Sequence, residues 1–179
     1  MKQLFFILFA AFAGEEIGLL GSSYWVSHPT LPPEKAVAMI NMDMIGRMKD
    51  SKVFVGGVGT GSTLKAMLEQ ANHGRDIKIE PSPGGYAASD HTSFVAKGIP
   101  VLFFFSGLHS DYHKPSDTWE KIDGQSTANL LELIEDVTSR LLAAEQRPQF
   151  VKVEMQLPGG RGGGGGYGPL FGSVPDFGQ

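Results

Sequence analysis

The sequence contains no cysteine among its 179 residues. Disulfide bridges and thiolate metal ligands are therefore excluded, so any metal must be held by nitrogen and oxygen atoms. Positive charge is also scarce, because 15 Lys and Arg residues stand against 19 Asp and Glu residues and give a formal net charge of -4. This balance argues against a nucleic-acid partner, which requires a basic surface. No apolar run reaches the roughly 18 residues of a membrane-spanning helix, so we expect no membrane span.

The composition that remains is typical of a globular protein, with 41% hydrophobic and 19% charged residues. Short apolar runs predict buried strands at residues 4–13, 36–43, 52–59, 77–80 and 99–107. Amphipathic spacing predicts helices at residues 15–27, 62–74, 89–98 and 125–146. Ser62 or Thr63 and Asp90 are expected to cap two of these helices. Strands that alternate with helices indicate a layered α/β domain.

The composition changes after Pro148. We expect one domain over residues 1–148, followed by a glycine-rich linker over residues 149–168, which contain the run "PGGRGGGGGYG". Residues 169–179 resemble one further strand without a partner. Because a single strand cannot bury itself, we interpret this segment as the start of a second domain.

The N-terminal apolar run has two interpretations. Lys2, the apolar residues 4–10 and Ala11-Phe12-Ala13 match a secretory signal with its cleavage site. Cleavage after Ala13 would leave a signal shorter than the usual length of roughly 15–30 residues. We therefore favour a buried strand that places Glu15 and Glu16 at its carboxyl end.

Chemically active residues follow four predicted elements. They are Glu15-Glu16, Asp43 in "NMDMIG", Asp90-His91 in "SDHTSF", and Tyr112-His113 in "HSDYHKPSDT". In an open α/β sheet, sites assemble at the carboxyl ends of strands. Carboxylates and imidazoles without thiolates suit a catalytic zinc ion, and an adjacent acid that is not a ligand can act as a general base.

Each of these residues also has a structural interpretation. Two glutamates at a helix start are commonly no more than favourable charges near the positive end of the helix dipole. Asp43 suits a turn or a cap, and Asp90 suits an N-cap. His109 is by default an ordinary loop histidine.

The combination of motifs resembles a known family. "AFAGEEIGLLGS", "NMDMIG", "SDHTSF" followed by "GIPVLFF", and "DYHKPSDT" occur in the order found in the co-catalytic di-zinc aminopeptidases. That family includes glutamate carboxypeptidase-like and transferrin-receptor-like members, and glutaminyl cyclases are relatives. The resemblance covers roughly residues 4–146. It implies a three-layer α/β/α sandwich with a mostly parallel mixed central sheet, in which residues 4–13 form a central strand.

The resemblance also implies roles for the candidate residues. Glu15 matches the general base toward a metal-activated water. Glu16 and His113 match ligands of one zinc ion, and Asp43 matches a ligand of the second. Tyr112 matches the phenol that hydrogen-bonds the oxyanion of the tetrahedral intermediate.

Three further residues take supporting roles by the same resemblance. Asp90 is expected to support the site from behind the ligands, and Asp117 to brace the loop that carries His113. His109 is expected beside the substrate. The implied reaction is the release of N-terminal residues from peptides with a free amino group.

One family motif does not precede Glu15 in this sequence. It is a His-x-Asp whose His binds one zinc ion and whose Asp bridges both. We therefore expect an N-terminally incomplete peptidase domain that binds zinc weakly and has little activity alone. By resemblance, we expect an extracytoplasmic parent protein and interpret residues 169–179 as the possible start of a PDZ-like domain.

Two other functions stay open from the sequence. A glutaminyl cyclase-type acyltransferase shares the fold but uses one zinc ion. A non-catalytic interaction protein on a peptidase scaffold is the second alternative. The motifs "GEEIGLLGS" and "DYHKPSDT" resemble the peptidases more closely.

Overall fold

The computed structural model describes residues 6–153. Its centre is a mixed four-stranded sheet with the strand order β1-β4-β2-β3. The strands are β1 (Met39–Asp43), β2 (Lys52–Gly56), β3 (Lys78–Pro81) and β4 (Val101–Phe105). β1 runs parallel to β4, β2 runs parallel to β3, and β2 and β4 are antiparallel. Two of the three pairings are therefore parallel, as expected for this fold class.

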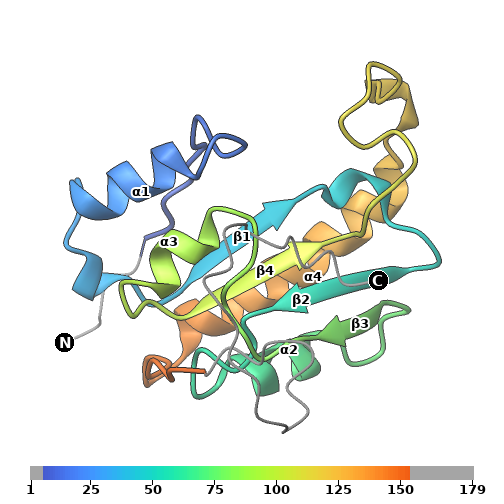
Figure 1. The fold of residues 1–179 in the computed structure, drawn as a ribbon. Coiled ribbons are helices and arrows are strands. Elements are labelled where there is room, and N and C mark those ends of the chain that lie inside the picture. The colour runs from blue at the N-terminus through green and yellow to red at the C-terminus, as the bar shows by residue number, and fades with distance from the viewer. Residues whose placement is uncertain (1–5, 154–179) are drawn as a thin grey trace, which may run out of the picture.

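Helices cover both faces of the sheet (Figure 1). On one face, α2 (Leu64–Ala71) and α4 (Gly124–Ala143) pack on the main core, to which Val53, Val55, Leu102 and Phe104 of the strands contribute. On the other face, α1 (Leu20–Ser27) and α3 (His91–Val95) form a smaller core with Val101. Successive side chains of β4 thus point to opposite faces of the sheet, as in any β-strand. The predicted α/β/α layering is confirmed.

Short 3-10 helices complete the described part of the chain: η1 (Pro33–Lys35), η2 (Ile45–Arg47) and η3 (Trp119–Lys121). β1 and β4 end in register, because Asp43 is paired with Phe105. The segments that leave these two strands therefore start from the same edge of the sheet. One begins with Met44 and η2, and the other is the loop of residues 106–118.

The expected strand at residues 4–13 is wrong for the residues that the structure describes. Residues 6–12 form no strand, and Phe6 and Phe9 are 69% and 85% exposed. A strand needs a neighbour that accepts and donates its backbone hydrogen bonds, and no described segment offers this run one. Gly14 does end the run, with a φ of 70°, but the helix expected from residue 15 begins only at Leu20.

The predicted N-cap residues lie at the helix starts, but their side chains do not make the expected capping hydrogen bonds. Thr63 and Asp90 occupy the N-cap positions of α2 and α3, yet neither side chain accepts a capping hydrogen bond. Asp90 already has helical angles, and a cap side chain reaches the first turn from an extended backbone. α4 shows the expected arrangement, since Asp123 accepts a 3.0 Å hydrogen bond from the Ser126 amide.

The predicted linker begins with residues that still contact the domain. The Ser62 amide donates to the Gln149 carbonyl at 2.9 Å, and the Val151 amide donates to the Thr60 carbonyl at 2.8 Å. The remainder of the linker and the strand expected at residues 169–179 lie outside the described residues. None of the helices in the described part of the chain combines the length and apolar composition that a membrane crossing needs.

Candidate active site

Glu16 and His113 meet although 97 residues separate them. Glu16 lies in the turn between Gly14 and α1, and His113 lies in the loop after β4. His113 Nε2 is 2.9 Å from Glu16 Oε1, and both side chains are more than half exposed. Because α1 begins four residues after Glu16, a helix-dipole role does not account for this carboxylate. The pair offers one imidazole nitrogen and one carboxylate at a single open position.

Glu15 lies among further carboxylates. Partial burial raises its pKa, and the charges of Glu16, Asp43 and Asp90 raise it further, while His113 opposes them. One oxygen of Asp90, Oδ1, is buried and has no hydrogen-bond partner among the described residues. The neighbouring carboxylates repel the charged form of Glu15, and a bound cation would relieve that repulsion. The donor set is the oxygen and nitrogen set that zinc accepts.

Tyr112 belongs to the same cluster. Burial raises the pKa of its phenol, and the carboxylates of Glu16, Asp43 and Glu15 raise it further. The hydroxyl therefore stays protonated well into the alkaline range and remains a hydrogen-bond donor. The Tyr112 ring stacks on the His113 ring, with centroids 3.8 Å apart. The loop thus presents a donor and an imidazole side by side.

Asp43 is hydrogen-bonded to a series of side chains that the sequence analysis did not predict. The Ser89 hydroxyl donates to Asp43 Oδ2 at 3.0 Å, and Asn41 Nδ2 donates to Ser89 Oγ at 2.8 Å. Asn41 Nδ2 also lies 3.3 Å from His91 Nδ1. The sequence contains one sign of the link between Asn41 and Asp43. The two residues are two positions apart in a strand, so their side chains share a face of β1. This series of hydrogen bonds fixes the orientation of the Asp43 carboxylate.

The exit from β1 is held in an uncommon conformation. Met44, directly after Asp43, has a φ of 52°, and His113 itself has a φ of 54°. Such angles are strained for residues other than glycine and persist where surrounding contacts enforce them. The hydroxyl of Ser106, buried at the end of β4, donates to the Met44 carbonyl. The carboxyl ends of β1 and β4 are therefore tied together directly behind the candidate ligands.

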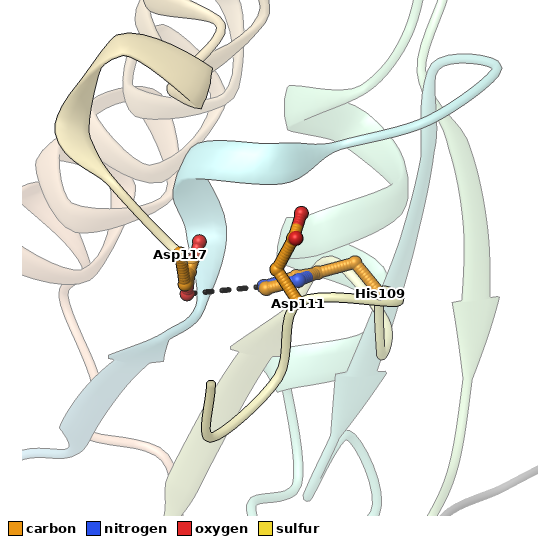
Figure 2. A group of neighbouring side chains, drawn as sticks. All are labelled: His109, Asp111 and Asp117. Carbon is orange, nitrogen blue, oxygen red and sulfur yellow. Dashed lines mark ion pairs between the residues drawn. The ribbon is translucent and has the colours of Figure 1, made fainter. Parts of the chain in front are cut away.

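His109 and Asp117 lie in a separate group with Asp111 (Figure 2). His109 Nε2 is 3.6 Å from Asp117 Oδ2. One ligand atom from each residue falls within 4.8 Å of the others, and no other three such residues among residues 6–153 meet this limit. Asp43 is thus not within that distance of both Glu16 and His113. The prediction that Asp43 serves a different ion is compatible with this separation.

The His109 group is an ion-pair network rather than a second metal centre. Arg47 contacts Asp111 at 3.0 Å and Asp117 at 2.8 Å, and Lys121 contacts Asp111 at 2.7 Å. Hydrogen bonds from Lys121, Ser116 and Arg47 lower the pKa of Asp111 well below its usual range. Two cationic side chains already occupy these carboxylates. Sequence reasoning missed both Arg47 and Asp111.

The buried His91 leads to a prediction about pH and stability. Burial lowers its pKa to about 4, from an ordinary value of 6.5, and its ring stacks on Phe103. Between these pH values the unfolded chain binds the proton and the folded chain does not, so stability falls as pH falls. Urea unfolding at pH 7 and pH 4.5 should show a loss of about 2 to 3 kcal/mol from this residue.

His91→Phe should remove that part of the pH dependence, because phenylalanine keeps a stacked ring but binds no proton. His28→Gln, at an exposed histidine, is the matched control and should leave the pH dependence unchanged. An equal loss of stability in wild type and His91→Phe would contradict the assignment.

Comparisons with known proteins identify the family of the chain. A sequence profile of Peptidase family M28 matches residues 5–138. A curated relative from Arthroderma benhamiae, named "Probable leucine aminopeptidase", is 32% identical over 129 residues, which cover 69% of this chain and 35% of the relative. The chain spans about a third of the length of the curated relatives that it matches.

Solved structures show the same likeness. BSAP, a zinc aminopeptidase from Bacillus subtilis, matches with a TM-score of 0.62 and 26% identity over 73% of this chain and 34% of that protein. A glutaminyl cyclase from Porphyromonas gingivalis matches with a TM-score of 0.57 and 18% identity over 74% of this chain and 50% of that protein. At that identity, the second likeness concerns the fold alone.

Proposed function

Because the chain belongs to Peptidase family M28, we propose that it supplies the general base, the oxyanion donor and part of the ligand set of a zinc aminopeptidase. The observation that carries the proposal is the 2.9 Å contact between Glu16 and His113, with Glu15 and Tyr112 beside it. A carboxylate and an imidazole that converge from distant segments make a metal-binding position, and the two neighbouring groups supply proton transfer and hydrogen bonding.

The proposed ligands divide between two ions. Glu16 and His113 would hold one zinc ion, and Asp43 would hold the other, oriented by Ser89. A catalytic zinc ion takes about three protein ligands, so an upstream His-x-Asp would complete both positions. When bound, zinc acts as a Lewis acid that polarises the scissile carbonyl and acidifies water.

Glu15 and Tyr112 carry the proton transfer and the charge stabilisation. Glu15 takes a proton from the attacking water and returns it to the leaving amine, and partial burial raises its pKa, which favours this role. Tyr112 donates a hydrogen bond to the carbonyl oxygen as negative charge develops on it. Because the phenol stays protonated, this donor is present over the whole neutral range.

The proposed substrates are peptides with a free N-terminus. An ammonium group is attracted to carboxylates, and Glu15 and Asp90 are the carboxylates of this cluster that are not proposed as zinc ligands. The name of the relative from Arthroderma benhamiae supports an apolar N-terminal residue such as leucine. An extracytoplasmic location for the parent protein is part of the same proposal.

The test compares this chain with an extended polypeptide that adds the upstream reading frame. We expect the extended form to bind two zinc ions and to release the chromophore from a leucine anilide, and a chelator to abolish the reaction reversibly. The 179-residue chain alone should bind zinc weakly and react slowly. An extended form that holds zinc but does not hydrolyse the anilide would overturn the proposal.

The same experiment distinguishes the alternative functions. A glutaminyl peptide serves as the second substrate, because the fold is shared with a glutaminyl cyclase. Cyclisation of that peptide without anilide hydrolysis would indicate an acyltransferase. An upstream reading frame without a His-x-Asp would favour a non-catalytic interaction protein.

A further inference from the structure

We propose that Arg47 is a positioning residue that clamps the loop carrying Tyr112 and His113 to the end of β1. The consequence for metal binding rests on the proposed function, since it takes His113 and Asp43 as ligands. The clamp itself rests on the ion pairs of one guanidinium.

The Arg47 guanidinium joins two carboxylates that bracket the loop. Its Nη2 donates to Asp111 Oδ2 at 3.0 Å, and its Nη1 donates to Asp117 Oδ1 at 2.8 Å. Tyr112 and His113 lie between these two aspartates in the sequence. The side chains of Arg47 and Asp111 are 21% and 14% exposed, so this pair is more sheltered than an ordinary surface ion pair. Two forked contacts from a planar group fix orientation as well as distance.

Arg47 is also tied to the other candidate ligand. It closes η2 (Ile45–Arg47), four residues after Asp43, and η2 packs against α4 of the main core. Among residues 6–153, its ion pairs are the only ones that connect this segment with the loop of residues 106–118. Ser106 ties the start of this loop to Met44, and Arg47 holds the part of the loop around His113 against the segment after Asp43.

The loop needs such a contact because its own backbone is irregular. It contains no strand or helix between residues 106 and 118, and His113 has a left-handed backbone. Figure 2 shows Asp111 and Asp117 in the group with His109, from which the loop continues into η3. Lys121 of η3 adds a second cation on Asp111 at 2.7 Å. Without Arg47, Asp111 keeps Lys121 as a cationic partner, whereas Asp117 keeps only His109.

The experiment measures amide hydrogen exchange in the 179-residue protein and its variants. Arg47→Gln should accelerate exchange of the amides in residues 107–118 about tenfold while the unfolding midpoint changes little, because local opening is separate from global unfolding. Arg75→Gln is the matched control, since Arg75, in the segment that follows α2, also contacts two acids, but these are Glu132 and Asp136 of α4. It should leave exchange in residues 107–118 unchanged.

A second measurement separates positioning from a merely structural role. Co²⁺ is titrated into each variant, and its visible absorption reports the ligand geometry. Arg47→Gln should weaken Co²⁺ binding about tenfold and alter the absorption bands, whereas Arg75→Gln should do neither. Wild-type protein that binds no Co²⁺ even as the extended polypeptide would contradict the proposed function, while the exchange data would still test the clamp.

The clamp is wrong if exchange in residues 107–118 rises no more in Arg47→Gln than in Arg75→Gln. The positioning role is wrong if the loop opens faster but the affinity and spectrum of bound Co²⁺ stay those of wild type. Asp117→Asn, which removes one of the two ion pairs, carries the test if Arg47→Gln fails to fold. An increase of about threefold in loop exchange supports the clamp, and unchanged exchange overturns it.

Discussion

Replacing Glu15 with glutamine is expected to lower the kcat for leucine anilide about a thousandfold in the zinc-loaded extended polypeptide, while zinc affinity stays within about threefold of wild type. Glutamine keeps the size of the side chain but accepts no proton at neutral pH, and general base catalysis contributes roughly 10²–10⁴ in rate. Partial burial raises the pKa of Glu15, which makes the wild-type group a better proton acceptor than an exposed glutamate.

Glu16→Gln is the matched control, because it makes the same change at the neighbouring residue. Glu16 contacts His113 at 2.9 Å, so its loss should reduce zinc affinity as well as activity. Zinc content after dialysis, together with kcat, distinguishes the two variants. Equal loss of zinc in both would show that the roles of base and ligand are not divided as proposed.

The sheet was predictable because local pattern and tertiary environment agree there. Residues 101–105 are apolar throughout, and β4 is buried between helices on both faces, which is what an uninterrupted apolar run indicates. Asp43 was predictable for a related reason, since it is the first charged residue after the apolar residues of β1. A strand end at the carboxyl edge of such a sheet is where a functional group is expected.

The N-terminal run shows that an uninterrupted apolar run does not always form a buried strand. Residues 6–12 are as apolar as β4, yet they form no strand, and residues 6–11 lie exposed. Hydrophobic pattern predicts that a segment can be buried, but a strand also requires a neighbour to complete its backbone hydrogen bonds. Composition carries no information about that neighbour.

Arg47 was missed for a different reason. Its partners, Asp111 and Asp117, lie in the motif "DYHKPSDT" but are 64 and 70 residues away, and nothing in the sequence pairs either of them with Arg47. Ser106 and Ser89 were missed likewise, because a serine acts through the one acceptor that its hydroxyl reaches. The groups that carry the proposed chemistry are recognisable from motifs, whereas the groups that orient them depend on long-range geometry.

Replacing Tyr112 with phenylalanine is expected to lower kcat roughly a hundredfold or more with a small change in KM. Loss of one donor to a developing oxyanion costs about 10²–10³ in kcat, because the hydrogen bond strengthens as charge forms on the carbonyl oxygen. The phenylalanine ring can still stack on His113, so the loop should keep its arrangement. The measurement is steady-state hydrolysis of the leucine anilide from pH 6 to pH 9 by the zinc-loaded extended polypeptide.

The pH range of that measurement tests the protonation of the donor. Burial raises the pKa of the Tyr112 phenol above its ordinary value of 10, and bound zinc would offset the further contribution of Glu16 and Asp43. Wild-type activity should therefore show no loss from Tyr112 ionisation below pH 9, and the ratio of wild-type to variant kcat should stay constant across the range. A ratio near one at every pH would remove Tyr112 from the oxyanion site, and a ratio that collapses toward pH 9 would mean that the phenol ionises within the range. If the rate loss instead appears in KM alone, Tyr112 binds substrate and transition state equally, and the oxyanion must be stabilised by other groups.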